Sequence, residues 1–253
     1  MDRLRDPGGC PWDREQTLTD LKTYLIEESY EVLEAMEMED WTHLQEELGD
    51  LQFQIVFISR LAKEKGKFTW GDVADGIRKK MVSRHPHVFG DVEAKTAADV
   101  LGKWEKNKRQ EAKSKGKSIL GGIPRSLPAL LKAQRMTNKA AHLGFDWENI
   151  GDVVAKLEEE IAEWKAEIGS DDPAAKRRAK EELGDILFVI ANIARKMGVD
   201  PEDALQLSNE KFRRRFEEVG RRLADSGRDF PDSTLEEMDR IWNEVKGAEK
   251  ENG

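Results

Sequence analysis

Apolar residues recur along this chain at helical intervals. In residues 154–168, and again in 186–194, apolar positions are spaced three and four apart, which is the spacing of one face of an α-helix. Pro173, Pro201 and Pro231 stand where helices would start or break. No stretch alternates at period two for long enough to form a sheet, so the pattern predicts an all-α protein. The apolar positions are Val154, Leu157, Ile161, Trp164 and Ile168 in the first stretch, and Ile186, Leu187, Ile190, Ile193 and Ala194 in the second.

The charged and polar residues form one pattern of motifs that occurs twice along the chain. A Glu-x-x-Glu pair, a Glu-Leu-Gly-Asp segment, a Lys/Arg pair and a Trp/Lys pair follow one another in the same order in each half. Gly and Pro residues interrupt the helical pattern between the halves. We therefore predict two tandem repeats of roughly four helices each, which form helical bundles on dimerisation. The first repeat would span 1–118, a linker 119–124, and the second repeat 125–253.

Composition narrows the function classes. Charged residues make up 37% and hydrophobic residues 38% of the chain, and the net charge is −9. Non-specific nucleic-acid binding needs a basic footprint, so we expect no nucleic-acid partner. Cys10 is the only cysteine, which excludes an intrachain disulfide. No apolar run is long enough for a membrane span and the start does not read as a signal peptide, so we expect a cytoplasmic protein.

Four carboxylates of the second repeat form the first candidate site. Glu160 and Glu163 are three apart and share one helix face, and Glu182 and Asp185 do the same on the next helix. If these helices pack antiparallel, four carboxylates converge beside the apolar stripe, where repulsion and desolvation demand a cation. Oxygen ligands without His or Cys select Mg²⁺, with Mn²⁺ as a possible substitute. Gly184 costs the helix about 1 kcal/mol relative to Ala, which predicts a close approach to the backbone there.

The first repeat carries the same carboxylate pattern. An isolated Glu-x-x-Glu pair in so acidic a chain usually marks a solvated helix face, but here the pairs lie on successive helices and occur twice. We therefore predict a second possible site in the first repeat. Its carboxylates are Glu28, Glu31, Glu47 and Asp50.

Cations and tryptophans supply candidate phosphate and base contacts. Lys211 and Arg215 are four apart on a third helix, where a guanidinium and an ammonium could grip phosphate oxygens. Trp242 with Lys246 could stack a base and hold a phosphate, although a tryptophan at helical spacing is also typical of a core. The candidate substrate-binding residues are Lys156, Lys180, Lys211, Arg215, Trp242 and Lys246, and those of the first repeat are Lys80, Arg84, Trp104 and Lys108.

These motifs resemble those of the MazG nucleoside triphosphate pyrophosphohydrolases in their two-repeat form, a group of all-α NTP pyrophosphatases. Segments 9–17, 84–90 and 123–130 are also similar to that family. The resemblance implies hydrolysis of nucleoside triphosphates to the monophosphate and pyrophosphate, with Mg²⁺, by a homodimer. It implies that the second repeat is the main catalytic one, although the first keeps the full set. By position, it makes Glu160, Glu163, Glu182 and Asp185 the catalytic metal ligands, Lys211 and Arg215 the triphosphate contacts, and Trp242 and Lys246 the rest of the nucleotide site.

The residues themselves suggest direct attack by water, because the chain shows no recognisable nucleophile signature. A metal would polarise the phosphoryl oxygens, and one carboxylate, for example Glu163, could orient the water as general base. Two alternatives stay open: a related all-α pyrophosphatase acting on dUTP or dCTP, and a non-enzymatic helical interaction module with acidic, solubilising faces.

Overall fold

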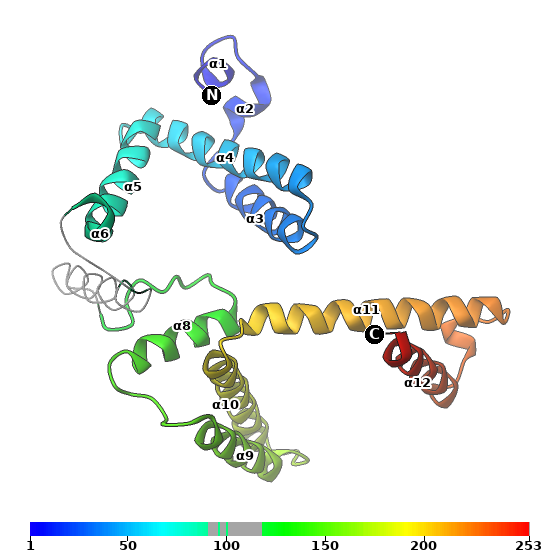
Figure 1. Ribbon diagram of the computed structural model, residues 1–253. Helices are drawn as coiled ribbons and strands as arrows, with labels where there is room; N and C mark the ends of the chain where they lie inside the picture. The colour runs from blue at the N-terminus through cyan, green and yellow to red at the C-terminus, as the bar shows by residue number, and fades with distance from the viewer. Residues whose placement is uncertain (91–95, 97–99, 101–117, 253) are drawn as a thin grey trace. The chain divides into compact units, whose positions relative to one another are not determined.

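Helices make up all the regular structure in the described part of the chain. The computed structural model describes residues 1–90, 96, 100 and 118–252, and no strand occurs among them. The all-α prediction is therefore confirmed. The chain divides into two compact units, residues 1–111 and 112–253, and each is described by itself (Figure 1).

The first unit is built on two long helices that pack side by side (Figure 1). Leu21 from one of them and Phe57 and Leu61 from the other form its buried core. The short turn between the two helices makes them antiparallel. The helices are α1 (Asp2–Arg5), α2 (Pro11–Glu15), α3 (Leu21–Glu37), α4 (Trp41–Glu64), α5 (Trp70–Arg84) and α6 (Pro86–Phe89).

The turn from α3 to α4 sets the alignment of those helices. Glu39 adopts a positive φ of 53°, a conformation that reverses the chain and that side chains other than Gly, Asn and Asp seldom adopt. The carboxylate of Asp40 then accepts hydrogen bonds from the backbone N–H groups of Thr42 and His43 and caps the start of α4. This arrangement brings the Glu-x-x-Glu pair of α3 beside the Glu-Leu-Gly-Asp segment of α4.

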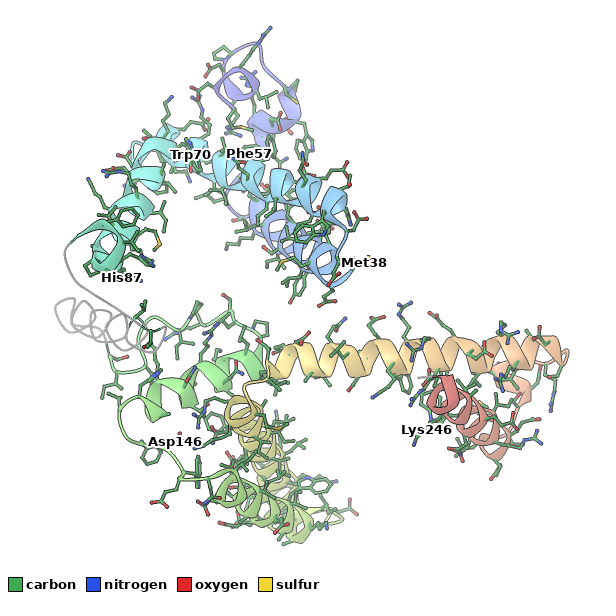
Figure 2. All side chains as sticks on the ribbon, viewed as in Figure 1. Met38, Phe57, Trp70, His87, Asp146 and Lys246 are labelled. Atoms are coloured by element: carbon green, nitrogen blue, oxygen red, sulfur yellow. The ribbon has the colours of Figure 1, made fainter. Side chains whose placement is uncertain are left out.

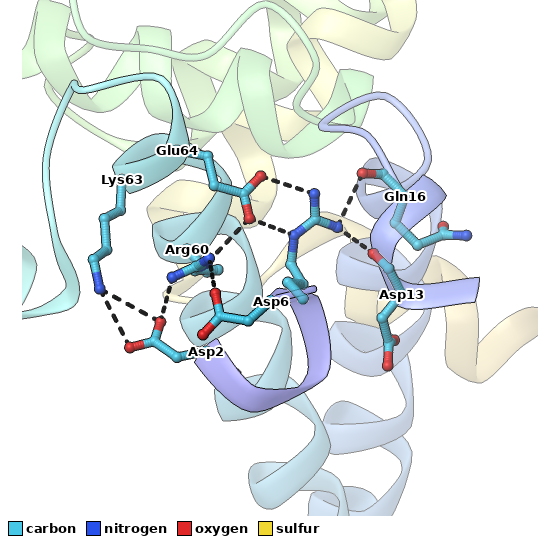
Figure 3. Close-up of polar contacts among 8 residues, drawn as sticks. Asp2, Asp6, Asp13, Gln16, Arg60, Lys63 and Glu64 are labelled. Carbon is cyan, nitrogen blue, oxygen red and sulfur yellow. Dashed lines mark hydrogen bonds and ion pairs between the residues drawn. The ribbon is translucent and has the colours of Figure 1, made fainter. Parts of the chain in front are cut away.

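An ion-pair network holds the N-terminal segment on the end of α4 (Figure 3). Arg5 Nε lies 2.7 Å from Glu64 Oε1, and Arg60 reaches Asp2 and Asp6 at 2.7 Å each. Hydrogen bonds from Arg5 and Arg60, with their charges, lower the pKa of Glu64 to about 2. Charged contacts therefore hold the segment that carries α1 and α2 on the end of α4, and the ion pair of Arg5 depends on an ionised Glu64.

The second unit contains one antiparallel pair, α9 with α10, against which α8 packs, and a second pair, α11 with α12 (Figure 1). Pro173 and Pro201 are the first residues of α10 and α11, and Pro231 lies in the 3₁₀ turn η1, so the predicted starts and breaks are confirmed. Asp172 and Asp200 cap α10 and α11 by accepting backbone N–H bonds. The elements are α8 (Ala129–Ala141), α9 (Ile150–Glu167), α10 (Pro173–Met197), α11 (Pro201–Asp225), η1 (Phe230–Asp232) and α12 (Leu235–Asn252).

The apolar stripes of α9 and α10 are only partly buried within the chain. Val153 is fully buried, whereas Val154, a position of the predicted apolar stripe, is 40% exposed. Leu187 and Ile190 on α10 are 46% and 40% exposed, and Ile168 is also exposed. The predicted helical period is confirmed, but α9 and α10 cover only one flank of each other, so part of the apolar stripe stays exposed in the single chain. No helix among the described residues is long and apolar enough to cross a membrane.

Candidate metal and nucleotide site

Three carboxylates of the second unit converge between α9 and α10. Oxygen atoms of Glu160, Glu163 and Glu182 all lie within 4.8 Å of one another. Glu160 is buried, Glu182 is half-buried and Glu163 is exposed. Because α9 and α10 are antiparallel, residues about twenty positions apart in sequence lie side by side on the two helices. This arrangement brings the Glu-x-x-Glu pair of α9 beside Glu182 of α10.

Asp185 lies one helical turn after Glu182 and at the edge of this group. It is exposed and is not among the three residues whose oxygens approach within 4.8 Å of one another. Desolvation, followed by the charges of Glu163, Glu160 and Asp185, raises the pKa of Glu182. The four carboxylates therefore interact electrostatically, and the cluster stores repulsion that a cation would relieve.

Lys156 already neutralises part of this cluster. Its Nζ lies 2.7 Å from Glu160 Oε1 and 2.7 Å from Glu159 Oε1. Hydrogen bonds to Glu159 and Glu160 raise the pKa of Lys156. The ammonium group of Lys156 thus pairs with a carboxylate oxygen of Glu160, one helical turn away, that a metal ion could otherwise bind.

A corresponding cluster lies between α3 and α4 in the first unit. Oxygens of Glu28, Glu47 and Asp50 lie within 4.8 Å of one another. Glu31 is exposed and outside this group, but its charge contributes, after desolvation and Asp50, to raising the pKa of Glu28. The two units therefore repeat the cluster, each with three of the four predicted carboxylates in close approach.

The helix glycines face open space within the chain. A Cβ placed on Gly184, or on Gly49 in the first repeat, would meet no described atom within 4 Å. No other part of the described chain comes close to either position, so the close approach expected at Gly184 stays a prediction. Any such approach must come from outside the described chain.

The predicted phosphate contacts lie on α11 and α12. Arg215 pairs with Glu249 at 2.6 Å and its guanidinium lies over the Trp242 ring, 5.8 Å from the centroid. Lys211 is exposed, and so is Lys246, which Figure 2 labels on α12. Among the described residues, no hydrogen bond or ion pair joins these side chains to the carboxylates of α9 and α10.

Trp242 packs against the α11–α12 core. It contacts the buried cluster of Val219, Leu223, Ile241 and Val245. Its half-buried position fits a core role, and base stacking by this residue stays a prediction.

The remaining predicted substrate-binding residues lie on α10, on α5 or outside the described residues. Lys180 is exposed on α10, Lys80 is exposed on α5, and Arg84 is half-buried at the end of α5. Trp104 and Lys108 lie outside the described residues.

Two side chains at the first cluster were not singled out from the sequence. Gln54 Nε2 donates to Glu28 Oε1 at 3.1 Å, and His43 Nε2 lies 2.9 Å from Glu47 Oε1. A signal for Gln54 was present: it is a polar residue within an apolar run, one helical turn after Asp50. The helical period of apolar positions by itself does not identify a buried polar side chain.

Comparison with known proteins links both clusters to one domain type. The MazG nucleotide pyrophosphohydrolase domain matches residues 16–89 and 149–220. These segments contain both carboxylate sets and both Lys/Arg pairs, whereas Trp242 and Lys246 fall outside them.

Several relatives match nearly the whole of this chain. The chain is 46% identical over 253 residues to a nucleoside triphosphate pyrophosphohydrolase of Escherichia coli, covering 98% of this chain and 95% of that protein. It is 40% identical over 250 residues to the nucleoside triphosphate pyrophosphohydrolase/pyrophosphatase MazG of Thermotoga maritima, covering 99% and 94%. It is also 45% identical over 247 residues to the uncharacterized protein YabN of Bacillus subtilis, where the match covers 98% of this chain but 50% of YabN.

Proposed function

We propose that this chain, which belongs to the MazG nucleotide pyrophosphohydrolase family, hydrolyses nucleoside triphosphates to the monophosphate and pyrophosphate. The observation that carries the proposal is the approach of three carboxylates, Glu160, Glu163 and Glu182, to within 4.8 Å between α9 and α10. We place turnover mainly in the second repeat, as expected from the family pattern.

The ligand chemistry of this cluster suits Mg²⁺. Every group that meets there is a carboxylate, a hard oxygen ligand that Mg²⁺ and Mn²⁺ prefer. Glu160, Glu163, Glu182 and Asp185 would hold the metal, and the raised pKa of Glu182 supports a site that favours a bound cation. When bound, the metal would polarise the phosphoryl oxygens and lower the pKa of a bound water.

The chain's own residues accept the proton of the attacking water and contact the phosphates. Glu163 is exposed at the cluster, so its carboxylate is available to accept the proton of an attacking water. The water oxygen forms a bond to the α-phosphorus, the bond from that phosphorus to the bridging oxygen breaks, and pyrophosphate leaves. Lys156 can exchange Glu160 for a phosphate oxygen, since its ammonium lies 2.7 Å from the Glu160 carboxylate and its side chain is partly exposed.

We further propose that the active form is a homodimer. Leu183, Leu187 and Ile190 form an exposed apolar stripe on α10, next to the carboxylates, and exposed apolar patches of this kind mark interfaces. A second chain would cover this stripe. It would also account for Gly184, whose backbone is open in the single chain, and for the separation of Lys211 and Arg215 from the carboxylates.

A substrate panel tests the proposal. Canonical and damaged nucleoside triphosphates are incubated with the chain and Mg²⁺, and the products are identified. We expect monophosphate and pyrophosphate, and no turnover in chelator. Diphosphate and orthophosphate as first products would contradict cleavage between the α and β phosphates, and turnover of dUTP or dCTP alone would favour the related pyrophosphatase activity.

A further inference from the structure

Two residues of α12 hold the guanidinium group of Arg215 on α11. Arg215 Nε lies 2.8 Å from Glu249 Oε2, and Arg215 Nη2 lies 2.6 Å from the same oxygen. The guanidinium carbon lies 5.8 Å from the centroid of the Trp242 ring. Only 15% of the Arg215 side chain is exposed. These contacts fix a long side chain that would otherwise sample many rotamers.

Glu249 uses only one edge of the guanidinium group. A guanidinium carries five N–H donors, and Glu249 accepts from Nε and Nη2, which form its side edge. In the described part of the chain, no acceptor pairs with Nη1 of Arg215. The Nη1/Nη2 edge therefore keeps two parallel N–H groups, an arrangement that binds two phosphate oxygens. A phosphate can bind Arg215 at this edge without displacing Glu249.

The carboxylate of Glu249 is itself held in place. Its other oxygen, Oε1, accepts hydrogen bonds from Arg214 Nε at 3.1 Å and from Arg214 Nη2 at 2.7 Å. Hydrogen bonds from Arg215 and Arg214 lower the pKa of Glu249, so the carboxylate is ionised at neutral pH. Glu249 therefore sets the orientation of Arg215 from a fixed position of its own.

The sequence of the first repeat contains the same residue types at the same spacing. Glu249 follows the tryptophan of its repeat by seven residues, about two turns of a helix, and Glu111 follows Trp104 by the same interval. Ser83 stands where the second repeat has Arg214, so that arginine is not part of the repeated pattern. Trp104 and Glu111 lie outside the described residues, and the comparison rests on sequence alone. The arginine of the Lys/Arg pair, the tryptophan and the glutamate are the members that recur.

We propose that Glu249 is a positioning residue for phosphate binding. It holds the guanidinium of Arg215 against Trp242 so that the Nη1/Nη2 edge is presented to a phosphate of the substrate. The inference rests on the proposed function, which supplies the triphosphate. An arginine that is fixed before the substrate arrives loses less conformational freedom on binding, which favours affinity. Glu249 acts through Arg215 and contacts no reacting atom.

Steady-state kinetics of the full chain with Mg²⁺ and triphosphate test this role. Glu249→Met removes both carboxylate oxygens and keeps the length of the side chain. We expect the KM to rise by about tenfold while kcat changes less, because a misplaced Arg215 loses contacts to the bound phosphate. Glu249→Gln keeps one acceptor oxygen and should recover part of the loss. Glu244→Met is the control, since Glu244 is exposed on the same helix and pairs with Arg222 at 3.3 Å, and its KM should stay unchanged.

A double-mutant cycle tests whether Glu249 acts through Arg215. In an Arg215→Ala background, Glu249→Met should have little further effect on the KM. Calorimetric titration with inorganic tripolyphosphate and Mg²⁺ repeats the comparison without turnover, and helix content and melting are checked for each variant. Glu249→Met should weaken tripolyphosphate binding by about the factor by which the KM rises.

Three results would overturn the role of Glu249. A lower KM in Glu249→Met would mean that the carboxylate competes with phosphate for Arg215. Unchanged KM and tripolyphosphate affinity in a folded Glu249→Met chain would mean that Arg215 needs no positioning. A full effect in the Arg215→Ala background would mean that Glu249 acts by another route. If the unchanged chain releases no pyrophosphate, the proposed function fails, and the calorimetry still decides the role of Glu249.

Discussion

Lys156 Nζ lies 2.7 Å from Glu160 Oε1, so a lysine of α9 neutralises the one buried carboxylate of the second cluster. The pair joins adjacent turns of one helix, and it places a mobile cation where both a metal and a phosphate would act. Its role as counter-ion and its proposed role as phosphate contact are separable by experiment.

Lys156→Met leaves Glu160 buried without its partner. In chelator, we expect a lower melting temperature than for the unchanged chain, because a buried carboxylate loses its counter-charge. Saturating Mg²⁺ should restore more stability to the variant than to the unchanged chain, and the KM for triphosphate should rise. Differential scanning fluorimetry and steady-state kinetics measure these effects. Lys180→Met, an exposed lysine on α10, is the control, and identical melting of both variants in chelator would contradict the idea.

Asp185→Asn, compared with Asp50→Asn at the corresponding position of the first repeat, tests which repeat hydrolyses the substrate. Each keeps the side-chain shape and removes one carboxylate charge. We expect Asp185→Asn to lower kcat by at least about a hundredfold, since even residues that only orient metal ligands cost tenfold to a hundredfold. Asp50→Asn should have a smaller effect. The reverse order would assign turnover to the first repeat. If neither change affects kcat, the assignment of the carboxylates is wrong.

Gly184→Ala separates helix propensity from function. With no described atom within 4 Å of the added Cβ, the change should stabilise the isolated chain by up to about 1 kcal/mol. If a second chain or the substrate approaches this backbone, turnover falls while stability in chelator rises. Chemical denaturation and kinetics on the same sample decide the outcome. A stabilised variant with full turnover would show that neither a second chain nor the substrate needs to approach the backbone at Gly184.

Leu187→Arg tests the dimer. The side chain is 46% exposed on the apolar stripe of α10, so a charge there should weaken a dimer interface while leaving the chain folded. We expect sedimentation at micromolar concentration to shift from dimer to monomer, with loss of turnover. Leu235→Arg, at a 74% exposed position at the start of α12, should not shift it. A fully active monomeric unchanged chain would refute the proposal.

Glu64→Gln tests the acid sensitivity of the first unit. Contacts with Arg5 and Arg60 lower the pKa of Glu64 from 4.5 to about 2, so the folded state favours the ionised group. Its contribution to stability is complete above pH 4.5 and is lost as the pH falls towards about 2. Urea unfolding at pH 7 should show a loss of about 1 kcal/mol in the variant, because solvent screens ion pairs at the surface, and little loss at pH 2. An equal loss at both values would exclude this role for the ion pairs.

The sequence by itself determined the helical class, the repeat and the identity of the charged motifs. The helical spacing of apolar residues predicted α9 and α10, and the positions of the prolines predicted the starts of α10 and α11. These predictions succeeded because helix propensity and capping depend on residues close together in sequence. The spacing of Glu160, Glu163 and Glu182 implied convergence once two helices pack antiparallel, and their meeting within 4.8 Å agrees with that implication.

Tertiary structure decided which side chains are buried and which partners they have. Period alone could not separate buried Val153 from exposed Val154, because adjacent residues border the same stripe and only the position of α10 selects between them. It also could not show that Gln54 contacts Glu28, or that Arg215 pairs with Glu249 instead of a carboxylate of α9. Such contacts join residues far apart in sequence, so they depend on how the helices pack.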